Sequence, residues 1–290
     1  MNMVARSERE HLPKTHHTIY QGDARFLSQV IADSSIHLIV TSPPYWSLKR
    51  YPPAEGQLGN IPELQSFLPE LNRVWKSCFQ ALVPGGRMCV VVGDVCLSRK
   101  KHGRHHVIPL HSYIIQQCIE IGFDNLAPII WYKIANCQTE MTRSTYFLGK
   151  PFEPNAIIKN DIEFILIFRK PGEYRHPTQE QRLRSKMPKA DFFEYFQQVW
   201  DIRGASTRKH PAPFPDEIAT RLTRMFSFAG DIVLDPFVGT GTTSVAASKL
   251  GRSSIGFELD RSYVELCRSR FLNLDLYSPA SFEIKRLDHF

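Results

Sequence analysis

Hydrophobic and polar positions along the chain follow two periodicities. Short segments typical of strands, most of them apolar and several rich in β-branched residues, occur at residues 18–21, 37–40, 88–92, 127–132, 162–168, 232–234 and 254–257. Apolar residues spaced three and four apart predict amphipathic helices over residues 63–82, 108–121, 215–228, 242–250 and 261–272. Strands that alternate with helices predict an α/β fold built on a doubly wound, mostly parallel sheet.

Three unusual segments fall where predicted strands end. They are Asp23, residues 41–46 and residues 235–243. Because ligand sites in doubly wound sheets gather at the carboxyl ends of the strands, we expect these segments to meet in one site.

The composition is that of an ordinary globular protein. The chain has 290 residues, of which 42% are hydrophobic and 22% charged, and this length allows one large α/β domain with or without a small insertion. No apolar run approaches the ~18 residues that span a bilayer. The six cysteines show no Cys-x-x-Cys spacing, so neither a zinc site nor a disulfide framework is expected. We expect a reduced, cytosolic protein without a resident metal.

The net charge of +7 is concentrated in the middle third of the chain. Residues 97–209 carry eighteen basic and eleven acidic side chains, whereas the parts before and after them are nearly neutral. Two clusters dominate. The first, over residues 97–106, has Arg99, Lys100, Lys101 and Arg104 and no acid, and the second, over residues 169–189, has seven basic residues against Glu173 and Glu180, among them Arg175, Arg182, Arg184, Lys186 and Lys189. Such local charge is typical of a surface that faces a polyanion, with a merely solvated surface as the alternative.

A glycine loop at residues 234–243 follows a predicted strand and opens a predicted helix. Gly239 and Gly241 allow a ligand to approach the backbone closely. The third glycine of a dinucleotide fingerprint is replaced by Ser244, and no Gly-Lys-Ser/Thr of a P-loop is present. Asp235 at the strand end disfavours a phosphate and favours an amine-bearing ligand.

The next predicted strand ends at Glu258, a carboxylate suited to the two hydroxyls of a ribose. A ligand with an amine, a ribose and no phosphate points to S-adenosylmethionine. A simple tight turn is the alternative interpretation of the glycine loop.

The segment after the second predicted strand combines rigid acceptors with aromatic rings. It reads Thr41-Ser42-Pro43-Pro44-Tyr45-Trp46. The two prolines fix φ and remove two backbone donors, which leaves nearby carbonyls as stiff acceptors. The serine adds an acceptor and the two rings add flat faces, so the segment suits a planar group that bears an amine.

These two motifs together resemble the amino-group DNA methyltransferases, which act on cytosine N4 or adenine N6. The order, with Ser-Pro-Pro-Tyr before Asp-Pro-Phe-x-Gly-x-Gly-Thr-Thr, resembles their β class. Residues 22–27, 129–133 and 210–215 resemble further motifs of the family, and the resemblance spans roughly residues 18–272. It implies the Rossmann-like methyltransferase fold, with a seven-stranded sheet and a small DNA-recognition insertion.

The resemblance assigns roles to particular residues. Ser42 and the Pro43 carbonyl would accept both hydrogens of the target amine, and Tyr45 would stack on a base flipped from the duplex. Asp235 would face the methionine amine of the cofactor, Glu258 its ribose and Asp23 its adenine. The implied catalytic set is Ser42, Pro43, Pro44 and Tyr45. The implied cofactor set is Asp23, Thr41, His210, Phe214, Asp235, Pro236, Phe237, Gly239, Thr240, Gly241, Thr242, Thr243 and Glu258. The implied DNA-binding set is Trp46, Arg99, Lys100, Lys101, Arg104, Lys133, Arg175, Arg182, Arg184, Lys186 and Lys189.

The resemblance also implies an organisation and partners. Residues 15–133 and 200–275 would form the catalytic and cofactor-binding core, and residues 134–199 a strand plus the target-recognition region, with 171–198 as its variable part. Residues 1–14 and 276–290 would be tails. Duplex DNA is the implied substrate, with a cognate restriction endonuclease as partner and a monomer or homodimer as the oligomeric state.

Serine at position 42 favours cytosine N4 over adenine N6, because family members with Asp or Asn there mostly act on adenine. The chain has no Pro-Cys pair, which excludes methylation of cytosine C5. Methylation of RNA or of a protein, a nucleotide-dependent oxidoreductase and a catalytically dead DNA-binding regulator are the remaining alternatives. The order of the motifs disfavours methylation of RNA or protein. The missing third glycine disfavours the oxidoreductase, and the intact motifs disfavour the inactive regulator.

Overall fold

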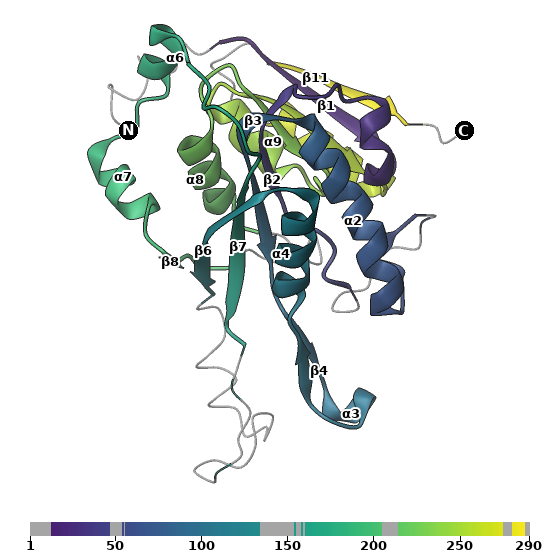
Figure 1. Ribbon diagram of the computed structural model, residues 1–290. Coiled ribbons are helices and arrows are strands. Elements are labelled where there is room, and N and C mark those ends of the chain that lie inside the picture. The colour runs from purple at the N-terminus through teal and green to yellow at the C-terminus, as the bar shows by residue number, and fades with distance from the viewer. Residues whose placement is uncertain are drawn as a thin grey trace.

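The computed structural model describes residues 13–46, 54, 56–133, 154, 158, 160–204, 214–274 and 280–287, without the side chain of residue 101. A nine-stranded sheet runs through its centre in the order β11-β1-β10-β9-β2-β3-β7-β6-β8 (Figure 1). In chain order the strands are β1 (Thr15–Gln21), β2 (Ile36–Thr41), β3 (Leu82–Val92), β6 (Asp124–Tyr132), β7 (Ile162–Arg169), β8 (Val199–Asp201), β9 (Ile232–Asp235), β10 (Ser253–Glu258) and β11 (Ala280–Arg286). Among these strands β7 alone runs antiparallel to its neighbours.

Helices cover both faces of the sheet. The helices are η2 (Ala24–Gln29), η4 (Leu58–Asn60), α2 (Leu64–Ala81), α3 (Arg99–His102), α4 (Leu110–Ile121), α6 (Gln179–Arg184), α7 (Lys189–Tyr195), α8 (Asp216–Phe226), α9 (Thr242–Lys249) and α10 (Arg261–Leu272). The first core cluster joins the sheet to η2, α2 and α4, and the other two clusters join it to α8, α9 and α10. None of these helices combines the length and apolar character needed to cross a bilayer.

Strand β2 shows why both faces must be covered. Leu38 and Val40 belong to the cluster that contains α8 and α9, whereas Ile36 and Ile39 pack with α2, and all four side chains are fully buried. A strand that buries both faces reads as a continuous apolar run, which is the pattern predicted over residues 37–40.

The predicted doubly wound sheet is confirmed, with two differences at its edges. The sheet has nine strands in the described structure rather than seven, because β11 and β8 extend its two edges. Residues 276–290 were expected to be a tail, but β11 pairs in parallel with β1 along its whole length. Phe282 and Ile284 alternate with exposed residues and pack beside Phe271, so a period-two signal was present in the sequence.

Strand β3 is also longer than predicted. It begins at Leu82 and contains Gly85 and Gly86, which exchange backbone hydrogen bonds with Lys170 at the end of β7. After β3, strands β4 (Val95–Leu97) and β5 (His106–Ile108) pair as a two-stranded arm with α3 at its tip. Figure 1 shows this arm projecting from the carboxyl end of β3.

The second basic cluster lies at the opposite end of the sheet from the predicted site. Because β7 is antiparallel, the chain leaves it at the amino edge of the parallel strands. A groove of about 1230 Å³, mouth included, is lined there by His37 and Gly85 near the starts of β2 and β3 and by Arg175 and Arg182. The six residues of β2 separate this edge from the carboxyl edge by roughly 20 Å.

This position does not fit the predicted role of residues 171–198 in reading a target base. The five cations predicted to contact DNA there are Arg175, Arg182, Arg184, Lys186 and Lys189. Arg175 instead makes a bidentate ion pair with the buried Asp231, at 2.6 Å for each oxygen, and Arg184 pairs with Glu180 at 2.6 Å. The sequence pattern located the strand but did not reveal its reversed direction.

The Arg175 pair should contribute to stability. Replacing Arg175 by Ala leaves the Asp231 carboxylate, which is 2% exposed, with fewer donors. We expect the free energy of unfolding to fall by about 2 kcal/mol in urea titrations. Arg182→Ala is the matched control, since Arg182 is exposed and makes no ion pair within the described structure, and it should change stability by less than about 0.5 kcal/mol. Equal effects of the two substitutions would contradict the assignment.

Candidate active site

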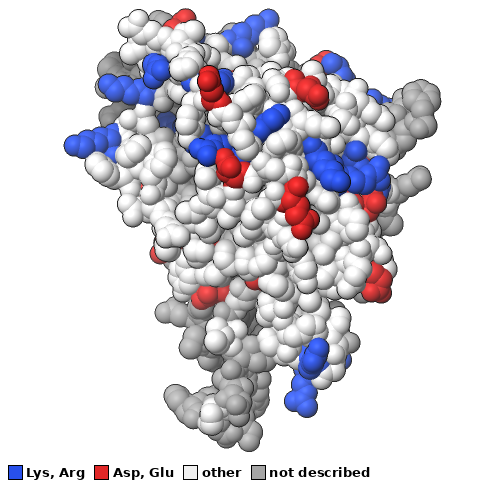
Figure 2. Space-filling model, in the orientation of Figure 1, with Lys and Arg blue, Asp and Glu red and all other residues white. Residues whose placement is uncertain are grey.

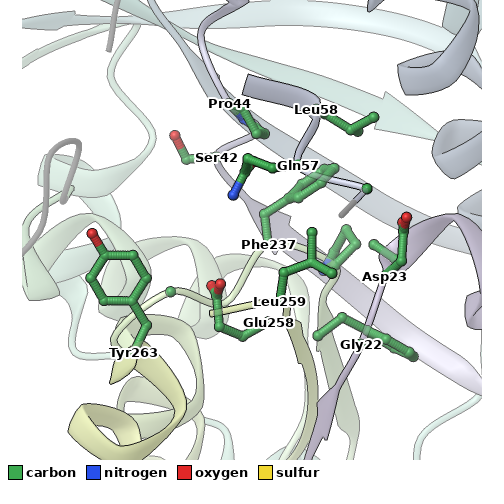
Figure 3. Close-up of a pocket in the computed structure, with 15 residues that line it drawn as sticks. Gly22, Asp23, Ser42, Pro44, Gln57, Leu58, Phe237, Glu258, Leu259 and Tyr263 are labelled. Carbon is green, nitrogen blue, oxygen red and sulfur yellow. The ribbon is translucent and has the colours of Figure 1, made fainter. Parts of the chain in front are cut away.

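A cleft opens at the carboxyl ends of β1, β2, β9 and β10 (Figure 3). With its open mouth included, the cleft takes up about 610 Å³. Its lining residues are Gly22, Asp23, Ala24, Ser42, Pro44, Gly56, Gln57, Leu58, Pro236, Phe237, Gly239, Phe257, Glu258, Leu259 and Tyr263. The three segments that the sequence placed at strand ends therefore meet in one site, as expected.

The cleft has two ends of different character. Figure 3 shows Ser42, Glu258 and Tyr263 toward one end and Asp23 with Leu58 toward the other. The lining contains two carboxylates and, among the described residues, no Lys or Arg side chain. Such a site suits a ligand with positive charge and without phosphate groups.

Glu258 supplies the central carboxylate. Its Oε1 accepts the backbone N–H of Asp260 at 2.9 Å. Burial raises its pKa to about 7, and backbone donors, among them the N–H groups of Gly239 and Leu259, oppose this rise. The position agrees with the predicted contact to a ribose.

Asp23 closes the other end of the cleft. Its Oδ1 accepts the backbone N–H of Arg25, and its Oδ2 accepts Nε of the same residue, both at 2.8 Å. Arg25 also pairs with Glu70 on α2. The sequence located Asp23 at the cleft but did not reveal that a neighbouring guanidinium holds its carboxylate.

Asp235 differs from its predicted role. It does not line the cleft and is 1% exposed. Its carboxylate accepts the hydroxyl hydrogens of Thr41 and Thr243, each at 2.7 Å, and the backbone N–H of Phe237 at 3.0 Å. Burial raises its pKa to about 6 against the opposing effect of these donors. Asp235 therefore joins the strand end that carries Ser42 to the glycine loop, instead of lining the cleft.

Other predicted cofactor residues support the loop without lining the cleft. Arg270 of α10 donates to the hydroxyls of Thr240 and Thr242 at 3.3 and 3.0 Å, and it pairs with Asp216 at 2.8 Å.

Phe214 is 9% exposed and packs in the core cluster beside α8. His210 lies outside the described residues.

Tyr45 is not presented as a stacking surface. Its side chain is 4% exposed, and it links two groups by hydrogen bonds. The Ser42 hydroxyl donates to the Tyr45 oxygen at 3.1 Å, and the Tyr45 hydroxyl donates to Oε2 of Glu163 at 2.9 Å. Glu163 comes from the start of β7 and pairs with Lys133 at the end of β6. The predicted stacking of Tyr45 on a base therefore does not fit this arrangement.

Two residues of the predicted DNA-binding set are engaged inside the protein. Trp46 is 9% exposed, has φ of 40°, and packs in the core cluster with α2. Lys133 pairs with Glu163 and lies 4.7 Å from the centroid of the Trp131 ring. By contrast, Arg99, Lys100 and Arg104 are exposed on the arm at the carboxyl end of β3, while the side chain of Lys101 lies outside the description.

Comparisons with known proteins agree with this geometry. The family model described as DNA methylase matches residues 36–269. The type II methyltransferase M.MjaI of Methanocaldococcus jannaschii is 39% identical over 279 residues, covering 86% of this chain and 88% of that protein. M.MthZI of Methanothermobacter thermautotrophicus is 35% identical over 284 residues, covering 89% and 77%.

Solved structures show the same likeness. TTHA0409 of Thermus thermophilus, crystallised with S-adenosyl-L-methionine, superposes with a TM-score of 0.76 and 47% identity, covering 94% of this chain and 98% of that one. The cytosine-N4-specific PvuII DNA methyltransferase superposes with a TM-score of 0.66 at 22% identity, over 91% and 90% of the two chains. These likenesses confirm the predicted methyltransferase fold.

Gly241 sets the turn that leads from the loop into α9. Both Gly241 and Gly230 have φ of 85°, but a Cβ atom at Gly241 would collide with Sγ of Cys267, whereas one at Gly230 would meet open space. We expect Gly230→Ala to cost about 1 kcal/mol from backbone strain. Gly241→Ala should cost about 1–3 kcal/mol more, because it also overpacks the interior. Urea titration of both variants tests this, and equal losses would refute the close approach.

Proposed function

Because this chain belongs to the N6/N4 DNA methylase family and uses S-adenosylmethionine, we propose that it methylates the N4 amine of cytosine within a short duplex site. The broader activity, amino-group methylation of DNA in a type II system, follows from the family and the type II relatives. The choice of cytosine rests on Ser42, which lines the cleft beside Pro44.

The residues of the cleft fit the cofactor. Glu258 would accept the ribose hydroxyls, and Asp23 with Leu58 would border the adenine at the other end. Phe237 and Pro236 would pack on the ligand, and the carboxylates of the lining suit a cationic ligand. When bound, S-adenosylmethionine supplies an electrophilic methyl group on a sulfonium centre.

Ser42 and Pro43 would prepare the target amine. The lone pair of an exocyclic amine is delocalised into the base ring, so the nitrogen is a poor nucleophile. Because the Ser42 hydroxyl donates its hydrogen to Tyr45, its lone pairs remain to accept an amine hydrogen, and the Pro43 carbonyl would accept the other. These contacts draw the nitrogen toward tetrahedral geometry and aim its lone pair, so orientation and electrostatics supply most of the rate.

The first basic cluster is the better placed of the two to hold duplex DNA. Figure 2 shows Lys and Arg side chains at the tip of the arm formed by β4, α3 and β5. Arg99, Lys100 and Arg104 would contact phosphates there and position the duplex without reading its sequence. Most of residues 134–159, part of the predicted target-recognition region, lie outside the described residues. A cognate endonuclease that cuts the same site would be the partner, and a monomer or a homodimer the working unit.

The base assignment is tested by methylating unmethylated genomic DNA with tritiated S-adenosylmethionine, followed by digestion to nucleosides and chromatography. We expect label in N4-methylcytosine. Ser42→Ala should lower the single-turnover rate by roughly 10²-fold or more while cofactor affinity stays unchanged, since the variant loses an acceptor at the reacting group. Label in N6-methyladenine would overturn the cytosine assignment, and an unlabelled digest would overturn the activity. Ser35→Ala, in a turn before β2, is the matched control and should keep full activity.

Glu258 should make cofactor affinity depend on pH. Because burial raises its pKa to about 7, the carboxyl group loses its proton as pH rises from about 6 to 8. The ionised form is the better acceptor for two hydroxyls, so we expect the dissociation constant from calorimetry to fall over this range. Glu258→Gln should bind more weakly and without this dependence. An unchanged pH profile in the Gln variant would show that another group titrates.

A further inference from the structure

A continuous hydrogen-bonded chain leads away from Ser42, which lines the cleft. The Ser42 hydroxyl donates to the Tyr45 oxygen at 3.1 Å, and the Tyr45 hydroxyl donates to Oε2 of Glu163 at 2.9 Å. The second carboxylate oxygen of Glu163 pairs with the Lys133 ammonium. The chain thus joins the end of β2 to the start of β7 and the end of β6.

Glu163 is built into the protein rather than placed on its surface. It is 8% exposed, and its side chain packs over Gly93 just beyond β3, where a Cβ atom would lie 3.1 Å from Cγ of Glu163. The Lys133 ammonium pairs with its carboxylate, so the buried charge has a counter-ion. An ionised carboxylate can only accept, so it fixes the direction of every hydrogen bond before it.

That direction matters at Ser42. Since Tyr45 donates to Glu163, its oxygen can accept from Ser42, and the Ser42 oxygen in turn faces the cleft as an acceptor. The Tyr45 hydroxyl also lies 3.3 Å from the carbonyl oxygen of Val91, which holds the ring in place.

The other carboxylates near the site make no such link to Ser42 in the described structure. Asp235 is occupied by two threonine hydroxyls and a backbone N–H. Glu258 accepts backbone N–H groups, and Asp94 binds Nδ1 of His111 at 2.6 Å. Glu163 is therefore the carboxylate whose hydrogen bonds lead to the reacting group.

We propose that Glu163 is a positioning residue that acts through Tyr45 and Ser42 and takes up the proton lost by the methylated amine. This inference rests on the proposed function. As the nitrogen gains its bond to the methyl carbon, the bond from that carbon to the sulfonium sulfur breaks and the sulfur is left as a neutral thioether. The N–H bond then breaks and an O–H bond forms at Ser42. The original Ser42 proton moves to Tyr45 and the original Tyr45 proton moves to Oε2 of Glu163. The amine ends neutral and Glu163 ends as a carboxylic acid, which releases its proton to water before the next turnover.

The test measures single-turnover methylation of DNA by preformed enzyme–cofactor–DNA complexes. Glu163→Gln keeps the shape of the side chain but removes the proton acceptor, and Tyr45→Phe keeps the ring but interrupts the chain. Each should slow transfer by roughly 10²-fold, as expected for loss of a general base. The double variant should be slowed by roughly 10²-fold as well, not by the 10⁴-fold of two independent losses, because both substitutions break the same chain.

Binding separates this role from a purely structural one. We expect the dissociation constants for cofactor and DNA to match those of the unaltered protein in both single variants, and circular dichroism to show both variants folded at the assay temperature. Glu283→Gln is the matched control, since Glu283 also pairs with a lysine, Lys285, at 2.8 Å, but does so on the exposed edge strand β11. It should leave the rate unchanged.

Each outcome distinguishes the proton route through Glu163 from its alternatives. If the unaltered protein labels DNA and Glu163→Gln does so at the same rate, or if rate and affinity fall together, the proton route is overturned while the activity stands. Multiplicative losses in the double variant would also overturn it. If the unaltered protein leaves DNA unlabelled, the proposed function fails and the inference fails with it.

Discussion

The hydrogen bonds from Thr41 and Thr243 to the Asp235 carboxylate join the end of β2 to the start of α9. Burying a carboxylate is costly unless donors surround it, and here two hydroxyls and one backbone N–H do so. Ser42 follows Thr41 directly, and the glycine loop lies between Asp235 and Thr243. The spacing between the amine acceptor and the cofactor loop is therefore fixed by one buried group. In-line transfer tolerates little error in that spacing.

The sequence pattern predicted most of the sheet because both faces of its central strands are buried. Apolar runs marked β2 and β9, a shorter apolar pattern marked β10, and the carboxyl ends of these strands meet as parallel strands must. Direction was harder to predict. An apolar run looks the same in either direction, so the reversal of β7 was not visible. The chain after β7, with Arg175 and its neighbours, was consequently predicted to recognise the target, a role that its position at the amino edge of the sheet does not fit.

The sequence predicted which residues line the site better than it predicted what each residue does there. Asp23, Ser42, Phe237 and Glu258 line the cleft as expected, because each stands at or just after a strand end. The roles of Tyr45 and Asp235 depend on partners 118 and 194 positions away in the chain, Glu163 and Thr41 respectively. A motif describes the local chain, so it could not reveal that these distant groups already satisfy the tyrosine hydroxyl and the aspartate.

The same long separation affects how the protein is made on the ribosome. Strand β2 pairs with β3 on one side and with β9 on the other. The 194 positions between Thr41 and Asp235 correspond to roughly 10–40 s of translation at ~5–20 residues per second. During that interval one edge of β2, in which four of the six residues are apolar, has no pairing partner, and such edges promote aggregation. The permuted order of the two motifs therefore makes the nascent chain depend on protection of the β2 edge until β9 is synthesised.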